Sequence, residues 1–64
     1  MSILKEKYVI GKGFDKGATL SVYEYSDGSI HYLFRDRLGR PSNVDGHNEA
    51  EFLIETFNMQ KQDI

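Results

Sequence analysis

Residues 19–36 read TLSVYEYSDGSIHYLFRD, and this stretch decides how the chain folds. Residues 19–25 and 29–36 are rich in β-branched and aromatic residues that alternate with polar ones, which is typical of β-strands. Between them, Ser26-Asp27-Gly28 is a turn sequence of the kind that closes β-hairpins. The stretch therefore predicts two adjacent antiparallel strands.

The length of the hairpin loop decides which side chains share a face of the sheet. A two-residue loop at Asp27-Gly28 pairs Tyr25 with Ile30, whereas a three-residue loop with Gly28 in a left-handed bulge position shifts the pairing by one residue. We prefer the three-residue loop, because it separates apolar from polar side chains more cleanly and one helix can cover only one face. Its apolar face holds Leu20, Val22, Ile30, Tyr32 and Phe34, and its open face holds Ser21, Tyr23, Tyr25, His31, Leu33 and Arg35.

The segments on either side of the hairpin extend this sheet. Residues 6–11 predict a first strand, followed by a long connection over 11–18 that holds three of the six glycines. After the hairpin, residues 36–39 fit a turn. Residues 40–44 can add a short fourth strand, which Pro41 restricts to an edge of the sheet.

Residues from 46 or 48 to 60 predict one helix. Asn48 with Glu51 three residues later matches a capping box, and Asp45 is a rival N-cap. The residues expected to face the core recur at i, i+3, i+4 and i+7, and they are Ala50, Leu53, Ile54 and Phe57. Phe52 and Met59 lie seven residues apart and are expected on the outer face of the helix.

These elements define one domain over residues 1–64, of the α+β class. We expect a three-stranded antiparallel β-meander, with the short fourth edge strand as an option, and one C-terminal helix packed on one face. The core of a 64-residue chain is thin. No cysteine is present to form a disulfide, and His31 and His47 are too few ligands for a structural zinc site. Stability must then come from packing or from self-association.

The net charge of −2 conceals an uneven distribution. Residues 1–40 hold seven Lys or Arg and five acids, whereas residues 41–64 hold one Lys and five acids. The simplest interpretation is two solvated faces of opposite charge, and the alternative is two surfaces for different partners. No stretch approaches the roughly 18 apolar residues of a membrane span, so we expect no membrane partner and a cytoplasmic location.

The chain offers little for catalysis or for cofactor binding. The glycines between Gly11 and Gly17 lead into a strand, whereas a Walker A loop leads into a helix. The acids near His47 stand where turns and helix starts use them as caps, and no convergent acid–base pair is evident. We therefore expect no enzyme activity, no catalytic residue, no metal and no cofactor.

The chain contains Asp36-x-x-Gly39-Arg40 and, in the predicted helix, Glu49-Ala50-Glu51-Phe52-Leu53. With these residues, a three-stranded sheet followed by an acidic helix is similar to the arm-binding domains of tyrosine recombinases. The strands carry few of the basic residues that such a module needs, so we transfer no site residue. Tyrosines, His31 and Arg35 on the open face do resemble a stacking platform for single-stranded nucleic acid. A nucleic-acid-binding module is therefore the alternative function.

We expect a small non-catalytic protein-binding module, of a size that suits an accessory or inhibitory regulator of bacterial or phage type. We also expect a homodimer, formed first through the open sheet face because it offers the larger apolar patch. The candidate binding residues are Tyr23, Tyr25, His31, Leu33 and Arg35 on the sheet, with Phe52 and Met59 on the helix.

Overall fold

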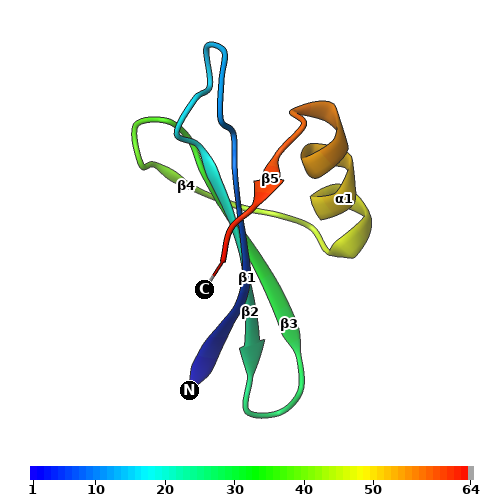
Figure 1. The fold of residues 1–64 in the computed structure, drawn as a ribbon. Helices are drawn as coiled ribbons and strands as arrows, with labels where there is room; N and C mark the ends of the chain where they lie inside the picture. Colours follow the sequence, from blue (N-terminus) through cyan, green and yellow to red (C-terminus); the bar gives the residue numbers. More distant parts are fainter. Residues whose placement is uncertain (64) are drawn as a thin grey trace.

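A computed structural model describes residues 1–63 as a five-stranded antiparallel sheet with one helix, which confirms the predicted α+β class (Figure 1). The elements are β1 (Ser2–Val9), β2 (Thr19–Tyr25), β3 (Ile30–Arg35), β4 (Pro41–Asn43), α1 (His47–Thr56) and β5 (Gln60–Lys61). The strands lie in the order β4-β3-β2-β1-β5. The short edge strand after the turn is present as β4, and β5 is a strand that the sequence did not predict.

The β2–β3 hairpin has the three-residue loop that the sequence favoured. The N–H of Tyr25 donates to the carbonyl of Ser29 at 2.9 Å, and the N–H of Gly28 donates to the carbonyl of Tyr25 at 2.9 Å. Gly28 has φ 88°, the left-handed conformation that this loop requires. As a result Leu20 lies opposite Phe34. The predicted register, and with it the division of side chains between the two faces, is confirmed.

The first strand begins earlier than predicted, at Ser2 rather than at residue 6. Its pairing with β2 continues to Ser2 opposite Tyr25, and a bulge between Leu4 and Glu6 interrupts the register. The bulge places an extra residue, Lys5, in the strand and disturbs the alternation that marks strands in a sequence. For this reason, the order of polar and apolar residues before residue 6 did not indicate a strand.

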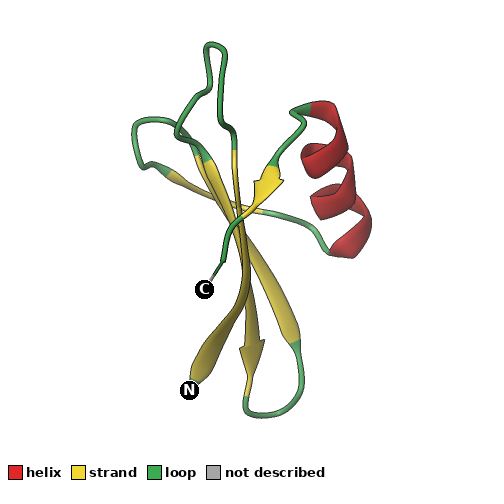
Figure 2. Cartoon of the chain, viewed as in Figure 1, coloured by secondary structure: helices red, strands yellow, loops and turns green. Residues whose placement is uncertain are grey.

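The helix packs on one face of the sheet and leaves part of that face uncovered (Figure 2). Beneath the helix lies the core, made of Ile10, Ala18, Leu20, Ala50 and Met59. The hairpin and the N-terminal half of β1 extend beyond the helix, at the bottom of the view (Figure 1). A helix of ten residues spans about 15 Å, whereas the seven-residue strand β2 spans about 23 Å. One end of the sheet therefore projects without cover.

The start of the helix differs from the prediction. Gly46, with φ 99°, is the N-cap and contributes no side-chain capping bond, so neither Asn48 nor Asp45 caps the helix. The carboxylate of Glu49 accepts a hydrogen bond from the N–H of Asp45 at 2.8 Å. An acidic side chain thus still satisfies a backbone donor near the first turn, but the residue involved is Glu49 and not the predicted Glu51.

The end of the helix corrects two further predictions. The helix stops at Thr56, and Asn58 takes a left-handed conformation with φ 49°, which reverses the chain. The N–H of Met59 then donates to the carbonyl of Ile54 at 2.9 Å. Met59 is consequently 7% exposed and belongs to the core, whereas Phe57 is 37% exposed. The predictions of a surface Met59 and a deeply buried Phe57 were both wrong.

This exchange of roles can be tested by truncation. Met59 is 7% exposed, so Met59→Ala should lower the free energy of unfolding by about 2–5 kcal/mol. Phe57→Ala, the matched control, should cost about 1–2 kcal/mol, because its ring is already partly in water. Urea unfolding followed by circular dichroism measures both losses. Equal losses for the two variants would contradict the placement of the core.

Candidate functional site

A groove lies along β3, where this strand becomes an edge of the sheet. β4 pairs only with Leu33–Arg35, and the chain then leaves the sheet toward the helix. The groove has a volume of about 500 Å³. It is lined by Tyr23 and Tyr25 of β2, by Ile30–Leu33 of β3, and by Asn43, Val44 and Gly46 of the departing chain. We call this site the edge groove.

The backbone of β3 faces the edge groove with unpaired groups. The Tyr25–Ser29 hydrogen bond fixes the alternation of the ladder, so the N–H and C=O of Ile30 and Tyr32 point away from β2. In the described register β4 begins to pair only at Leu33. Because the bridge between Leu33 and Asn43 puts Val44 opposite Tyr32, the N–H and C=O of Ile30 are the groups directed toward the space where another strand would lie.

Side-chain contacts order the hairpin end of the edge groove. The rings of Tyr25 and His31 are tilted by 58° with centroids 4.4 Å apart. The Ser29 hydroxyl lies 3.2 Å from Nε2 of His31 and donates to Oδ1 of Asp27 at 2.6 Å. A chain of contacts thus connects the turn to the aromatic wall of the groove.

A second contact joins β3 to the helix start. The Tyr32 hydroxyl lies 3.3 Å from Nδ1 of His47, and Nε2 of His47 lies 3.2 Å from a carboxylate oxygen of Glu51. Tyr32 is half-buried where the helix begins, so this contact ties the groove to the covered part of the sheet.

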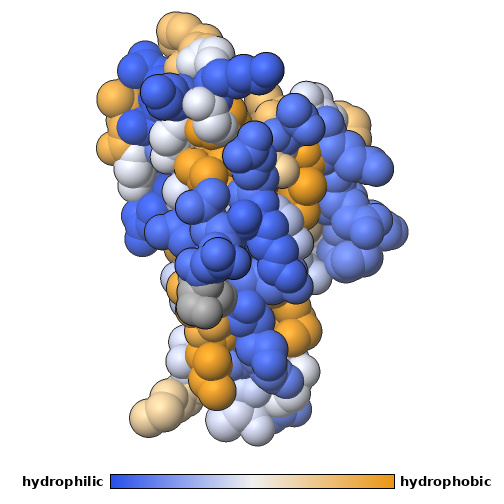
Figure 3. Space-filling model, viewed as in Figure 1, coloured by the Kyte–Doolittle hydropathy of each residue, from blue (hydrophilic) through white to orange (hydrophobic). Residues whose placement is uncertain are grey.

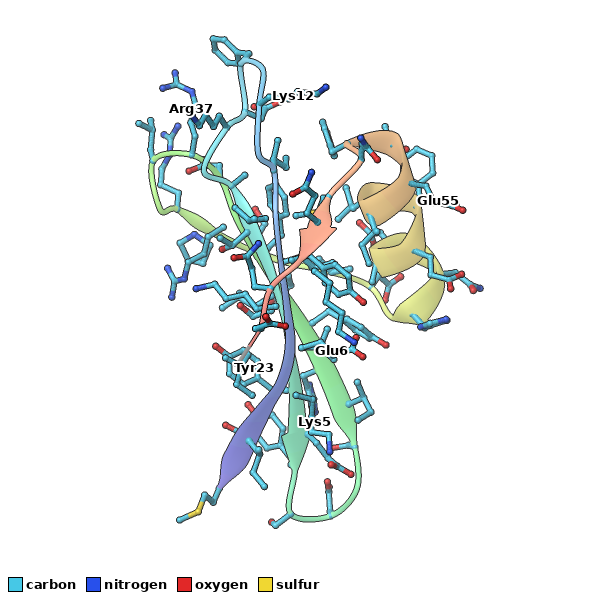
Figure 4. All side chains as sticks on the ribbon, viewed as in Figure 1. Lys5, Glu6, Lys12, Tyr23, Arg37 and Glu55 are labelled. Carbon is cyan, nitrogen blue, oxygen red and sulfur yellow. The ribbon has the colours of Figure 1, made fainter. Side chains whose placement is uncertain are left out.

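Four of the seven predicted binding residues line the edge groove, namely Tyr23, Tyr25, His31 and Leu33. Tyr23 lies on the side of the sheet away from the helix (Figure 4). Arg35 shares that face, but its guanidinium donates to the carbonyl of Gly39 at 2.9 Å and so belongs to the β3–β4 turn. Phe52 is exposed on the helix and does not line the groove, and the buried Met59 does not join it there. The prediction that Phe52 and Met59 share an exposed helix surface is therefore wrong for Met59.

The sequence interpretation missed Ile30, Tyr32 and Val44 as groove residues. Ile30 and Tyr32 were assigned to the face that the helix covers, yet Ile30 is 45% exposed. No local signal identified them, because the helix predicted to end at residue 60 would span about 20 Å and cover these strands, whereas the helix in the structure ends at Thr56.

The two edges of the sheet are not protected equally. On β1, only Lys7–Val9 pair with the chain around β5, so Ser2–Glu6 form a free edge as well. That edge carries the β1 bulge and Lys5, whose ammonium lies 3.4 Å from Glu24, and both features discourage strand pairing. On β3, the stretch before the residues that β4 and Val44 face is Ile30-His31, and it has no bulge, Lys or Pro. The edge groove is thus the edge open to another strand.

Residues 1–63 contain no cluster of side chains with the composition of a metal site. In the same range no helix is long and apolar enough to cross a bilayer. Scans of protein-family descriptions and searches of curated proteins and of solved structures found no match to this sequence.

The turn next to the groove has a titratable group with a shifted pKa. Hydrogen bonds from the hydroxyl and then the N–H of Ser29 hold the pKa of Asp27 below its usual value, because both donors stabilise the ionised carboxylate. A carboxyl whose folded pKa lies below its unfolded value contributes stability above the unfolded pKa. That contribution is lost as the pH falls through the folded pKa.

Removing the hydroxyl tests this contact. Ser29→Ala keeps the N–H donor and removes the stronger one, so we expect the pKa of Asp27 to rise toward its usual value. Carboxyl carbon NMR titration measures the shift. Asp36 is the internal control, since backbone N–H donors of Arg40 and Leu38 lower its pKa independently of Ser29. An Asp27 pKa that does not move would contradict the contact.

Proposed function

We propose that this protein is a non-catalytic protein-binding module that takes an extended segment of its partner into the edge groove as an added strand. The unprotected edge of β3 beside a groove walled by tyrosines carries this proposal. The proposal includes a cytoplasmic location, which the absence of cysteine favours. The small size fits an accessory or inhibitory regulator of bacterial or phage type.

Strand addition supplies affinity and specificity from different groups. The backbone of a bound segment would pair with Ile30, beyond the end of β4 and antiparallel to β3. Successive side chains of a strand point to opposite faces. One set would then meet Tyr23 and Leu33 on the open face, and the other would meet Val44 beside the helix. Among the described residues no Asp, Glu, Lys or Arg lines the groove, so we infer an uncharged partner segment.

A change confined to the strand edge tests the proposal. Ile30→Pro removes an N–H that points away from β2 and leaves the β2–β3 ladder intact, whereas Ile30→Val keeps the N–H and serves as the matched control. The probe is a phage-displayed library of unstructured peptides selected on the wild-type protein. Selected peptides should bind Ile30→Val like the wild type and bind Ile30→Pro about tenfold more weakly.

Amide hydrogen exchange of the peptide complexes locates the bound segment. Protection of the Ile30 amide is the expected result. Selected peptides that become helical, or that bind Ile30→Pro undiminished, would contradict strand addition. Circular dichroism confirms that the variants are folded before the comparison is made.

We also propose that two copies pair through this edge when no partner segment is present. The core is thin, and the exposed Ile30 and Tyr25 gain burial in a two-fold pairing of β3 with β3. Sedimentation at tens of micromolar should show dimers. Leu33→Glu should yield monomers, whereas Phe52→Glu, which introduces the same charge on the helix, should leave the dimer intact. A wild-type protein that sediments only as a monomer would contradict the pairing.

We do not extend the proposal to nucleic acid on the open sheet face. The cations on that face are Lys7 and Arg35, and Arg35 is turned to Gly39. Because affinity for phosphates requires several clustered cations, we expect binding no tighter than about micromolar at physiological salt. Fluorescence anisotropy with labelled single-stranded and duplex DNA measures it. If the protein bound DNA with submicromolar affinity and Tyr23→Ala abolished this binding, nucleic-acid binding would replace protein binding as the favoured function.

A further inference from the structure

A second exposed region lies at the end of the sheet opposite the hairpin. The loop between β1 and β2 and the loop between β3 and β4 meet there, at the top of the view (Figure 1). The guanidinium carbon of Arg37 in the second loop lies 4.6 Å from the ring centroid of Phe14 in the first. We call residues 11–17 and 35–40 together the loop end.

Folding concentrates positive charge at the loop end. Five of the eight Lys and Arg residues lie there with two acids, giving a net charge of +3. The rest of the chain has three cations and eight acids, a net charge of −5. The five cations are Lys12, Lys16, Arg35, Arg37 and Arg40, and all five are exposed. Arg35 donates to the carbonyl of Gly39 and Arg40 lies 3.2 Å from Asp36, so Lys12, Lys16 and Arg37 supply most of the attraction for anions. Figure 4 shows Lys12 and Arg37 at this end and Glu55 on the helix, away from it.

The loop end also exposes large apolar side chains. Phe14 is 81% exposed and Leu38 is 61% exposed, one in each loop. Figure 3 shows hydrophobic atoms standing among hydrophilic ones at the top of the molecule. Backbone hydrogen bonds hold the first loop in shape, from Gly17 to Ile10 at 2.9 Å and from Lys16 to Gly13 at 3.2 Å. The fold therefore holds Phe14 out in water on an ordered loop.

We propose that the loop end binds the surface of bilayers that contain anionic lipids. Cations attract the anionic headgroups. Apolar side chains that enter the membrane interface add the free energy of burying apolar surface, which is the second contribution to membrane affinity. An aromatic ring with Arg37 could also stack on a base, but the aliphatic Leu38 favours an apolar interface over nucleic acid. The sequence suggested no membrane partner because it lacks a spanning segment, and surface binding needs none.

The proposed site is independent of the edge groove, and single-tryptophan variants test it directly. The protein has no tryptophan, so Phe14→Trp introduces one reporter at the loop end. Phe52→Trp is the matched control. Like Phe14, Phe52 is exposed, at 62%, but it lies on the acidic helix. Phosphatidylcholine vesicles with added phosphatidylserine should shift the emission of Phe14→Trp to the blue and leave that of Phe52→Trp unchanged. Pure phosphatidylcholine should shift neither.

Substitutions of charge measure the electrostatic part. Lys12→Gln and Arg37→Gln should each weaken vesicle binding by about fivefold, and Lys61→Gln, whose ammonium already lies 3.4 Å from Glu6, should have little effect. Phe14→Ser should weaken binding by roughly tenfold. No emission shift with anionic vesicles would overturn the proposal. Equal binding to neutral vesicles, or binding of DNA without vesicle binding, would overturn it too.

Discussion

Gly28 in its left-handed conformation sets the register of β2 against β3, and the role of most side chains in the sheet follows from it. A shift of one residue would carry a whole strand's side chains to the other face. In the observed register Leu20 and Phe34 pair beneath the helix, while Tyr23 and His31 pair on the open face. The hydrophobic core and the aromatic wall of the edge groove thus depend on the same three-residue turn.

The length of the helix is the second constraint. Ten residues cover only part of the sheet, and the hairpin projects from beneath them. The chain between β4 and the helix leaves β3 after Asn43, so β3 loses its neighbour at the point where it also loses its cover. These two effects together produce a groove in which unpaired backbone groups and apolar side chains lie side by side. A longer helix or a longer β4 would remove it.

Local patterns predicted the parts of the fold that local energetics decide. The hairpin, its register and the edge position of Pro41 follow from the alternation of side chains and from turn chemistry. The same patterns also gathered Tyr23, His31 and other groove residues on one face. The reversal at Asn58 left no such signal, because a non-glycine residue with positive φ is specified by its surroundings. Met59 and the strand β5 that follows it could therefore not be placed from periodicity.

Charge is distributed along the molecule in a way that the sequence order hides. The basic residues are separated by up to 28 positions in the chain, from Lys12 to Arg40, and two neighbouring loops bring them together. The edge groove has no charged lining and lies toward the other end of a molecule that measures 37 × 22 × 21 Å. The first half of β3 lines the edge groove, and the last residue of β3 leads into the cationic turn. A single strand therefore connects the two surfaces. A partner strand in the groove would leave the loop end free, so both contacts are geometrically compatible in one chain.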